Sequence, residues 1–353
     1  MKTANPPRPV NFAEAARIAG VSRAALSFIL NKKPGVSEAT RQRVESVLAR
    51  INYRPAPRSK RRGVRKGMVG RLRRVGILIV GYHSKAQMKE HAKVFWSAIE
   101  SACGEIRRLG SLPELIFLPD PDKPPADLLD RGCDGWIGIG LMPEPKPWPE
   151  RLSQHLNPVV WMPCSAGLGW GDAVGINQEA TGLLAAKYLY EAGARTAAVV
   201  GLLNTRPIRT RTDSFVLRFQ QLGGNVVPMR PLRTFYTPAR TPDLFAVDTV
   251  VDDLFVGKKR PDGIFVSSDC FLPEVYTELR RNGIRPGTEV KIIGCSNERE
   301  YLHGLSPEPA TIDIRAEEIA VRAVQQLWWR QQHPEGERFA IIVEPQLVTP
   351  LRK

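Results

Sequence analysis

The chain has 353 residues, more than one ordinary hydrophobic core needs and enough for a small module joined to a larger domain. Hydrophobic residues make up 42% of it, as in a globular protein, and no run of about 18 apolar residues predicts a membrane span. The net charge of +15 is confined to residues 1–74, which carry 19 Lys and Arg against 3 Asp and Glu. A basic N-terminal segment joined to a nearly neutral remainder of the chain is typical of a protein that binds a polyanion.

Residues 11–30 predict two short helices around the turn A-G-V-S. Gly20 tolerates the left-handed geometry that ends the first helix, and Ser22 is a good cap for the second, Arg23 to Leu30. A third helix is predicted from Glu38 to Asn52, again after a serine cap. Three short helices in this arrangement indicate a helix-turn-helix module. Its predicted inward-facing residues are Phe12, Ala15, Ala16, Ala19, Val21, Leu26, Ile29, Leu30, Val44, Val47, Leu48 and Ile51.

Residues 54–74 contain ten basic residues, no acid, and several prolines and glycines that break a long helix. We therefore predict a DNA-binding domain at 1–57, a basic linker or hinge at 58–74 and a larger domain at 75–353.

The larger domain alternates apolar strands with amphipathic helices, which predicts parallel sheets covered by helices on both faces. The predicted strands are 75–80, 114–118, 134–140, 158–163, 173–177, 196–202, 262–268 and 290–296, and the predicted helices are 92–109, 148–156, 178–192, 210–222, 246–257 and 273–282. The alternation is long enough for two lobes, and ligands bind beyond the carboxyl ends of the strands in such folds. We assign lobe 1 to about 75–172 and 304–332, and lobe 2 to about 173–303 and 333–353.

Several other functions are not expected. The five cysteines form no C-x-x-C pair and the five histidines are scattered, so neither a metal site nor a disulfide is predicted. Gly135, Gly138 and Gly140 superficially suggest a dinucleotide-binding fingerprint, but the third glycine of that motif and the helix start are missing. We expect no enzyme, no cofactor and no membrane association, and the polar start of the chain, which lacks the apolar core of a signal peptide, predicts a cytoplasmic location.

The N-terminal motifs resemble those of the LacI/GalR family of bacterial repressors. The residues that match in order and spacing are Glu14-Ala15-Ala16, Ala19-Gly20-Val21-Ser22, Leu30-Asn31, Val36-Ser37, Thr40-Arg41, Arg43-Val44 and Asn52-Tyr53-x-Pro55. Weaker matches continue to the end of the chain, at Asp134-Gly135, Asp262-Gly263, Ser268-Asp269, Ile292-Ile293-Gly294 and Thr311-Ile312. The resemblance implies a helix-turn-helix followed by a two-lobed domain like a periplasmic binding protein.

The resemblance also implies which residues read DNA. Arg23, Ala24 and Phe28 take the base-reading positions of the second helix, and an arginine there can donate bidentately to guanine. Phe28 either touches a thymine methyl group or packs against the third helix. The candidate backbone contacts are Ser22, Ser27, Asn31, Arg41, Arg58, Lys60, Arg61 and Arg62. The hinge leucine of the family is missing, so the linker arginines either enter the minor groove, neutralise phosphates or form a solvated tether.

For the effector, the resemblance implies a cleft between the lobes. Arg211 and Phe215 match the family's R-x-x-G-F motif with serine for glycine, while Ser268, Asp269, Ser296 and Trp161 are further candidate contacts. Asp269 is open to a second interpretation as a helix cap. A sugar is the family's default ligand, although Ser296 stands where the family has an acid.

We therefore predict a homodimeric, sequence-specific repressor that binds a double-stranded operator, responds to a small molecule, and is found with the nucleoid. The alternative is an effector-independent architectural or constitutive DNA-binding protein, favoured by the arginine-rich linker and the altered cleft motifs.

Overall fold

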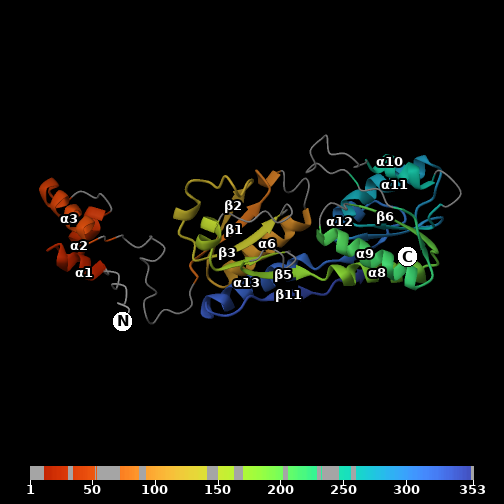
Figure 1. Cartoon of the computed structure of the whole chain (residues 1–353). Coiled ribbons are helices and arrows are strands. Elements are labelled where there is room, and N and C mark those ends of the chain that lie inside the picture. The colour runs from red at the N-terminus through yellow and green to blue at the C-terminus, as the bar shows by residue number, and fades with distance from the viewer. Residues whose placement is uncertain are drawn as a thin grey trace, which may run out of the picture. The chain divides into compact units, whose positions relative to one another are not determined.

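The computed structural model describes residues 12–30, 35–51, 53, 72–86, 93–140, 150–162, 170–201, 206–228, 232, 246–255 and 260–350 (Figure 1). The chain forms two compact units, Met1–Val69 and Gly70–Lys353. No helix among the described residues is long and apolar enough to cross a bilayer.

The first unit contains the helix-turn-helix. Its helices are α1 (Phe12–Ile18), α2 (Arg23–Leu30) and α3 (Glu38–Arg50). The turn is formed as predicted, because Gly20 has φ +65° and the Ser22 hydroxyl accepts a hydrogen bond from the Ala25 amide at 3.1 Å. Ser37 caps α3 in the same way. A small core holds the three helices together and consists of Ala15, Ala16, Ala19, Leu26, Ile29, Val44 and Leu48.

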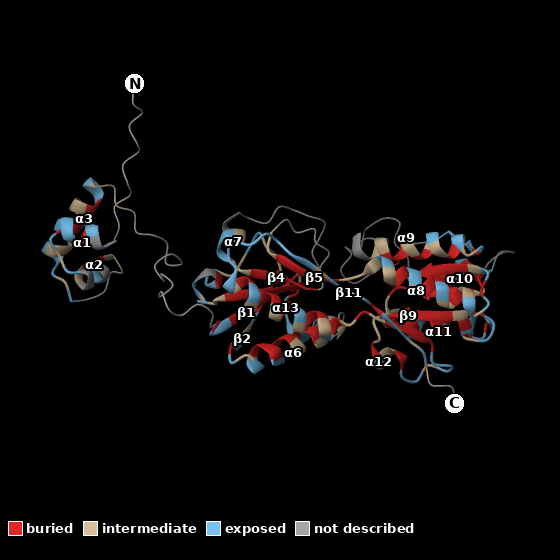
Figure 2. Cartoon of the chain, turned by 90° about the horizontal axis from the view of Figure 1, so that it is seen from below, coloured by how far each residue is buried: buried red, intermediate tan, exposed pale blue. Residues whose placement is uncertain are grey.

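Lobe 1 of the second unit is built on a parallel sheet with strand order β11-β5-β4-β3-β1-β2. These strands are β1 (Arg74–Val80), β2 (Leu112–Leu118), β3 (Gly135–Gly140), β4 (Val159–Trp161), β5 (Asp172–Ile176) and β11 (Ala340–Val343). Ile77 and Ile79 of β1 face the core under α6 (Lys93–Arg108) and α13 (Ala316–Gln332). Leu78 and Val80 face the opposite side, under α7 (Glu150–His155), so the strand is buried on both faces (Figure 2).

Lobe 2 repeats this plan with strand order β12-β10-β9-β8-β6-β7. The strands are β6 (Thr196–Val200), β7 (Asn225–Val226), β8 (Gly263–Val266), β9 (Lys291–Cys295), β10 (Ala310–Asp313) and β12 (Gln346–Val348), with β12 antiparallel to β10. Helices α8 (Gln178–Glu191) and α9 (Arg206–Gln221) contribute to the core on one face, and α10 (Val247–Phe255) and α11 (Leu272–Arg281) to that on the other. The short helices are η1 (Leu128–Asp130), η2 (Asp269–Phe271) and α12 (Arg299–Leu302).

The D-G pairs at the start of β3 and β8 have the same role in each lobe. Asp134 accepts the backbone amide of Arg73 at 2.8 Å, and Asp262 accepts that of Arg195 at 2.9 Å. Asp134 also accepts the Arg74 amide, and Asp262 the Thr196 amide. The two carboxylates therefore connect the start of β3 to that of β1 and the start of β8 to that of β6. At Gly263 a Cβ atom would lie 2.8 Å from the side chain of Ala194, so only glycine fits there.

The predicted fold class is confirmed, but the predicted lobe boundaries need three corrections. β5 pairs in the lobe 1 sheet, although we assigned residues from 173 onward to lobe 2. β10 pairs with β9 in lobe 2, and β11 pairs with β5 in lobe 1, each opposite to the assignment. An apolar strand pattern shows that a segment is buried but not which sheet it joins. The sequence therefore does not show at which residues the chain passes from one lobe to the other.

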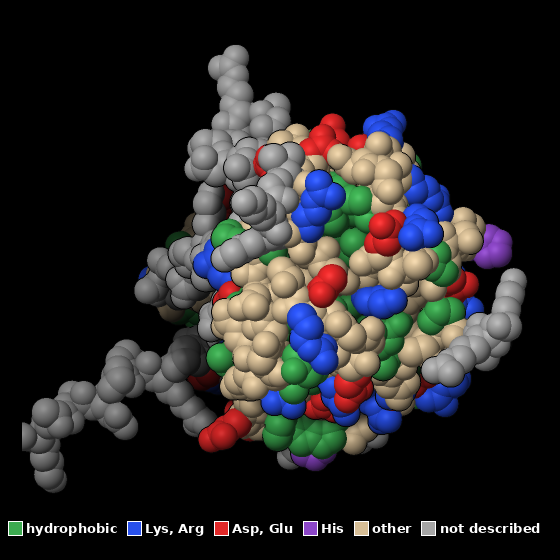
Figure 3. Space-filling view, turned by 90° about the vertical axis from the view of Figure 1, so that its right-hand side faces the viewer, with side chains coloured by type: hydrophobic (Ala, Val, Ile, Leu, Met, Phe, Trp, Pro, Cys, Tyr) green, Lys and Arg blue, Asp and Glu red, His purple; other side chains and the backbone are tan. Residues whose placement is uncertain are grey.

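The surface of the second unit carries charges of both signs. On the end of the molecule seen in Figure 3, Lys and Arg alternate with Asp and Glu, without a field of one sign. This agrees with the net charge of −1 that the sequence gives residues 75–353.

Candidate functional site

Helix α2 is the candidate DNA-reading element. Leu26 and Ile29 anchor it in the core of the module, while the ring of Phe28 is 41% exposed. Phe28 therefore lies outside the core of the module, with its ring beside Gly35 in the segment before α3, and its contact with a base stays a prediction. Arg23, Ala24 and Ser27 also lie on α2; Asn31, Arg58, Lys60, Arg61 and Arg62 lie outside the described residues.

Arg41 supports α2 from α3. Its Nη1 donates to the Ile29 carbonyl at 3.2 Å, near the carboxyl end of α2, where helix carbonyls lack intrahelical partners. Its Nε lies 3.7 Å from the Glu38 carboxylate. Arg41 thus has a structural role within the module in addition to the phosphate contact predicted for it.

The predicted effector residues of lobe 2 gather at the carboxyl edge of its sheet. Arg211 lies on α9, is 5% exposed, and donates from Nη1 to the Ser267 carbonyl at 2.6 Å and to Cys295 Sγ at 3.0 Å. Ser267 follows β8 and Cys295 ends β9, so the guanidinium spans two neighbouring strand ends. Ser268 and Ser296 are the next residues along.

Two aromatic predictions are corrected. Phe215 is fully buried and packs on Phe219 and Phe265, with centroid distances of 5.6 and 5.1 Å, so it is not an effector contact. Trp161 is 2% exposed and fills the space over Gly138, where a Cβ atom would lie 2.2 Å from its ring. Both rings face the apolar cores of their lobes, and the sequence could not distinguish such a position from a ligand-stacking one.

Asp269 is neither an effector contact nor a helix cap. Its carboxylate is fully buried, accepts from the Thr311 hydroxyl at 2.9 Å, and accepts from the Glu298 amide at 3.0 Å. Gly294 makes room for it, because a Cβ atom there would lie 2.0 Å from Asp269 Oδ1. Asp269 therefore positions the loop after β9. Burial raises its pKa to about 6, against the opposing effect of these hydrogen bonds.

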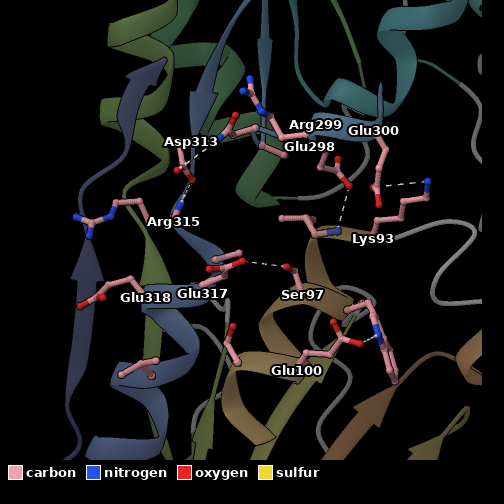
Figure 4. A pocket seen from close by; sticks show the side chains of 17 residues that line it. Lys93, Ser97, Glu100, Glu298, Arg299, Glu300, Asp313, Arg315, Glu317 and Glu318 are labelled. Atoms are coloured by element: carbon pink, nitrogen blue, oxygen red, sulfur yellow. Dashed lines mark hydrogen bonds and ion pairs between the residues drawn. The ribbon is translucent and has the colours of Figure 1, made fainter. Parts of the chain in front are cut away.

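A cavity of about 850 Å³ opens where the two lobes meet (Figure 4). The first turns of α6 and α13 line it from lobe 1, and residues 296–300 line it from lobe 2. Ser296 is the member of the predicted effector set that reaches it. Ser296, Asn297 and Arg315 have φ of 113°, 54° and 57°, which makes them the non-glycine residues with positive φ in the described ranges, and all three line the cavity. Such strain is concentrated at functional sites.

Two contacts across this cavity join the lobes. Glu298 of lobe 2 accepts the Val94 amide at 3.0 Å, which satisfies a free donor at the start of α6. Lys93 lies 3.6 Å from the Glu300 carboxylate. These residues were not among those predicted from the sequence. Glu298 and Glu300 flank Arg299 in the sequence, but nothing in the sequence links them to residues 93 and 94.

The environment of Glu298 favours its neutral form. Burial and then the nearby Asp269 carboxylate raise the pKa of Glu298 to about 7. A carboxyl group whose pKa is higher in the folded than in the unfolded chain stabilises the fold below its unfolded pKa, near 4.5. That contribution is lost as the pH rises through about 7.

Glu298→Gln is therefore expected to raise the free energy of unfolding by about 1–2 kcal/mol at pH 8, and to have little effect at pH 4.5. The glutamine oxygen can still accept the Val94 amide. Urea unfolding of the full chain at both pH values measures the difference, with the exposed Glu179→Gln as control. An equal effect at both pH values would contradict the assignment of the titrating group.

Comparison with known proteins supports the division of the chain. Residues 11–56 match the family of bacterial regulatory proteins of the lacI type, and residues 186–349 match the periplasmic binding protein-like domain. The transcriptional repressor PurR of Vibrio parahaemolyticus is 24% identical over 95% of this chain and 96% of its own length. The ribose operon repressor of Escherichia coli is 23% identical over 95% of this chain and 97% of its own length.

Solved structures show the same fold. A CelR–cellobiose complex superposes with a TM-score of 0.65 and 19% identity, covering 97% of this chain and 99% of that one. The Lac repressor dimer bound to operator and the anti-inducer ONPF superposes with a TM-score of 0.64 and 16% identity, covering 97% of this chain and 98% of that one. A regulator from Enterococcus faecium with bound ribose superposes with a TM-score of 0.61 and 18% identity, covering 78% of this chain and 97% of that one.

Fold, site and matches together define a DNA-binding transcription regulator with a periplasmic-binding-protein-like effector domain, of the same kind as the PurR and ribose operon repressors. Its N-terminal segment matches the lacI family of bacterial regulatory proteins, and the PurR and ribose operon proteins that it resembles over 95% of its length are transcriptional repressors.

Proposed function

We propose that this regulator is a homodimeric repressor that places the α2 helices of two protomers in successive major grooves of a near-palindromic operator. The observation that carries the proposal is the pairing of a well-packed helix-turn-helix with a net charge of +16 over residues 1–74. The Lac repressor dimer bound to operator supports it by analogy. A cytoplasmic, nucleoid-associated location follows from this function.

The two lobes suggest how a small molecule would control operator affinity. A ligand that binds one arrangement of the lobes more tightly than another shifts the population toward that arrangement, and the DNA affinity changes by the same coupling. Arg211, Ser268 and Ser296 remain our proposed effector contacts, since they occupy neighbouring strand ends in lobe 2. Bound cellobiose and ribose in similar structures support a small-molecule ligand.

Arg23→Ala tests the base-reading role of α2. It is expected to reduce the preference for a selected duplex over a scrambled one by about 5- to 150-fold, corresponding to about 1–3 kcal/mol. Competition anisotropy with both duplexes measures the preference, and Arg50→Ala at the exposed end of α3 is the matched control. An unchanged preference in the Arg23 variant would mean that this side chain does not read bases.

A further inference from the structure

The side chain of Arg211 is buried, and every partner that it has is neutral. Nε donates to Gln178 Oε1 at 2.9 Å, and Nη1 donates to the Ser267 carbonyl and Cys295 Sγ. Within the described part of the chain, no carboxylate forms an ion pair with it, and Nη2 donates to no group. The guanidinium is thus held rigidly by three bonds while one nitrogen, with two N–H donors, remains unused.

A buried charge without a counter-ion is costly, because it loses its hydration and gains no compensating attraction. The two buried carboxylates nearby do not compensate it. Asp269 binds Thr311 and the Glu298 amide, and Glu298 binds the Val94 amide. A counter-ion supplied by a ligand would remove this cost.

The surrounding polar groups also suit an anion. Ser268 and Ser296 follow the same two strands that Arg211 spans, and they offer neutral hydroxyls. In sequence, residues 201–211 contain three arginines and no acid. Hydroxyl and guanidinium donors recognise oxyanions, and the planar guanidinium matches a carboxylate or phosphate best.

We propose that the effector of this regulator carries an oxyanion, a carboxylate or a phosphate, which accepts hydrogen bonds from Nη2 of Arg211. This rests on the proposed effector site and specifies its ligand class. It separates this protein from similar structures whose bound ligands are the neutral sugars cellobiose and ribose.

The test is thermal unfolding of the full chain at constant ionic strength with matched probes. The neutral probes are glucose and ribose, and the anionic probes are glucuronate, glucose 6-phosphate, ribose 5-phosphate and inorganic phosphate. We expect at least one anionic probe to raise the Tm of the effector domain by roughly 3–6 °C at about twenty times its Kd, while its neutral counterpart does not.

Variants assign the effect to Arg211. Arg211→Gln is expected to abolish the shift, Arg211→Lys to retain part of it, and Arg209→Gln, an exposed arginine on the same helix, to leave it intact. If Arg211→Gln does not fold, the lysine variant carries the comparison. The proposal is overturned if no anionic probe shifts the Tm, if a neutral sugar binds equally well, or if the shift survives loss of Arg211.

Operator binding by the same samples separates this result from the proposed function. An Arg211-dependent anion shift in a chain that ignores DNA sequence would leave the ligand assignment standing and remove the repressor function. Sequence-specific DNA binding without any Tm shift from an anionic probe would leave the repressor function standing and overturn the ligand assignment.

Discussion

Replacing Arg58, Lys60, Arg61 and Arg62 together by glutamine is expected to weaken DNA binding by roughly three orders of magnitude at about 0.15 M salt. Each phosphate neutralised by a protein cation contributes about −0.9 to the slope of log K against log salt concentration, because counter-ions are released. Loss of four contacts should therefore flatten that slope by about 3–4. Titrations at several salt concentrations measure it for specific and scrambled duplexes alike.

A control with the same charge change isolates the linker. Glutamine at four exposed cationic residues of the second unit, Lys187, Arg285, Arg299 and Arg322, lowers the net charge equally. Their ion pairs lie at the surface, where such pairs contribute little to stability. We expect the salt slope of this variant to match the parent chain. A linker variant with the parent slope would identify residues 58–62 as a solvated tether.

Asp172→Ala is expected to lower the free energy of unfolding by about 3–5 kcal/mol, because it leaves Arg330 as an uncompensated buried charge. Asp172 is 1% exposed, and its Oδ1 and Oδ2 accept from Nη2 and Nε of Arg330 at 2.8 and 2.9 Å. Gln326 and the Phe339 amide donate to the same carboxylate. The network fixes α13 and the segment before β11 to β5.

The pH dependence of this network has a definite sign. Burial acts to raise the pKa of Asp172, but the hydrogen bonds from Arg330, Gln326 and the Phe339 amide outweigh it and hold the pKa below its ordinary value. The stabilisation is therefore present at neutral pH and is lost as the pH falls through the folded pKa. Urea unfolding measures the effect, with Glu191→Ala, which removes one partner of an exposed ion pair, as control. A loss below about 1 kcal/mol would show that the lobe relaxes around the missing carboxylate.

The helix-turn-helix could be predicted almost residue by residue because its signals are local. Gly20 has the positive φ that the turn requires, and Ser22 and Ser37 cap the helices that follow them. The bounds of α2 agree with the predicted helix, and α3 ends at Arg50, two residues before its predicted end.

The lobe junction could not be predicted, because its contacts join distant parts of the chain. Glu298 and Val94 are 204 residues apart, and neither belongs to a recognisable motif. The aromatic predictions failed for a related reason. Phe215 fits a ligand motif in sequence, but the sheet packed beneath α9 needs its ring in the core. Arg211 was identified from its motif alone, and only the structure shows that its partners are neutral.

The most direct test is to let the intact chain select from a pool of random duplexes at about 0.15 M salt and to sequence what it retains. A base-reading α2 in each protomer predicts enrichment of one near-palindromic motif with two half-sites. A retained pool with the starting base composition, held only by a steeply salt-dependent interaction, would contradict that reading role and point to an architectural DNA-binding protein.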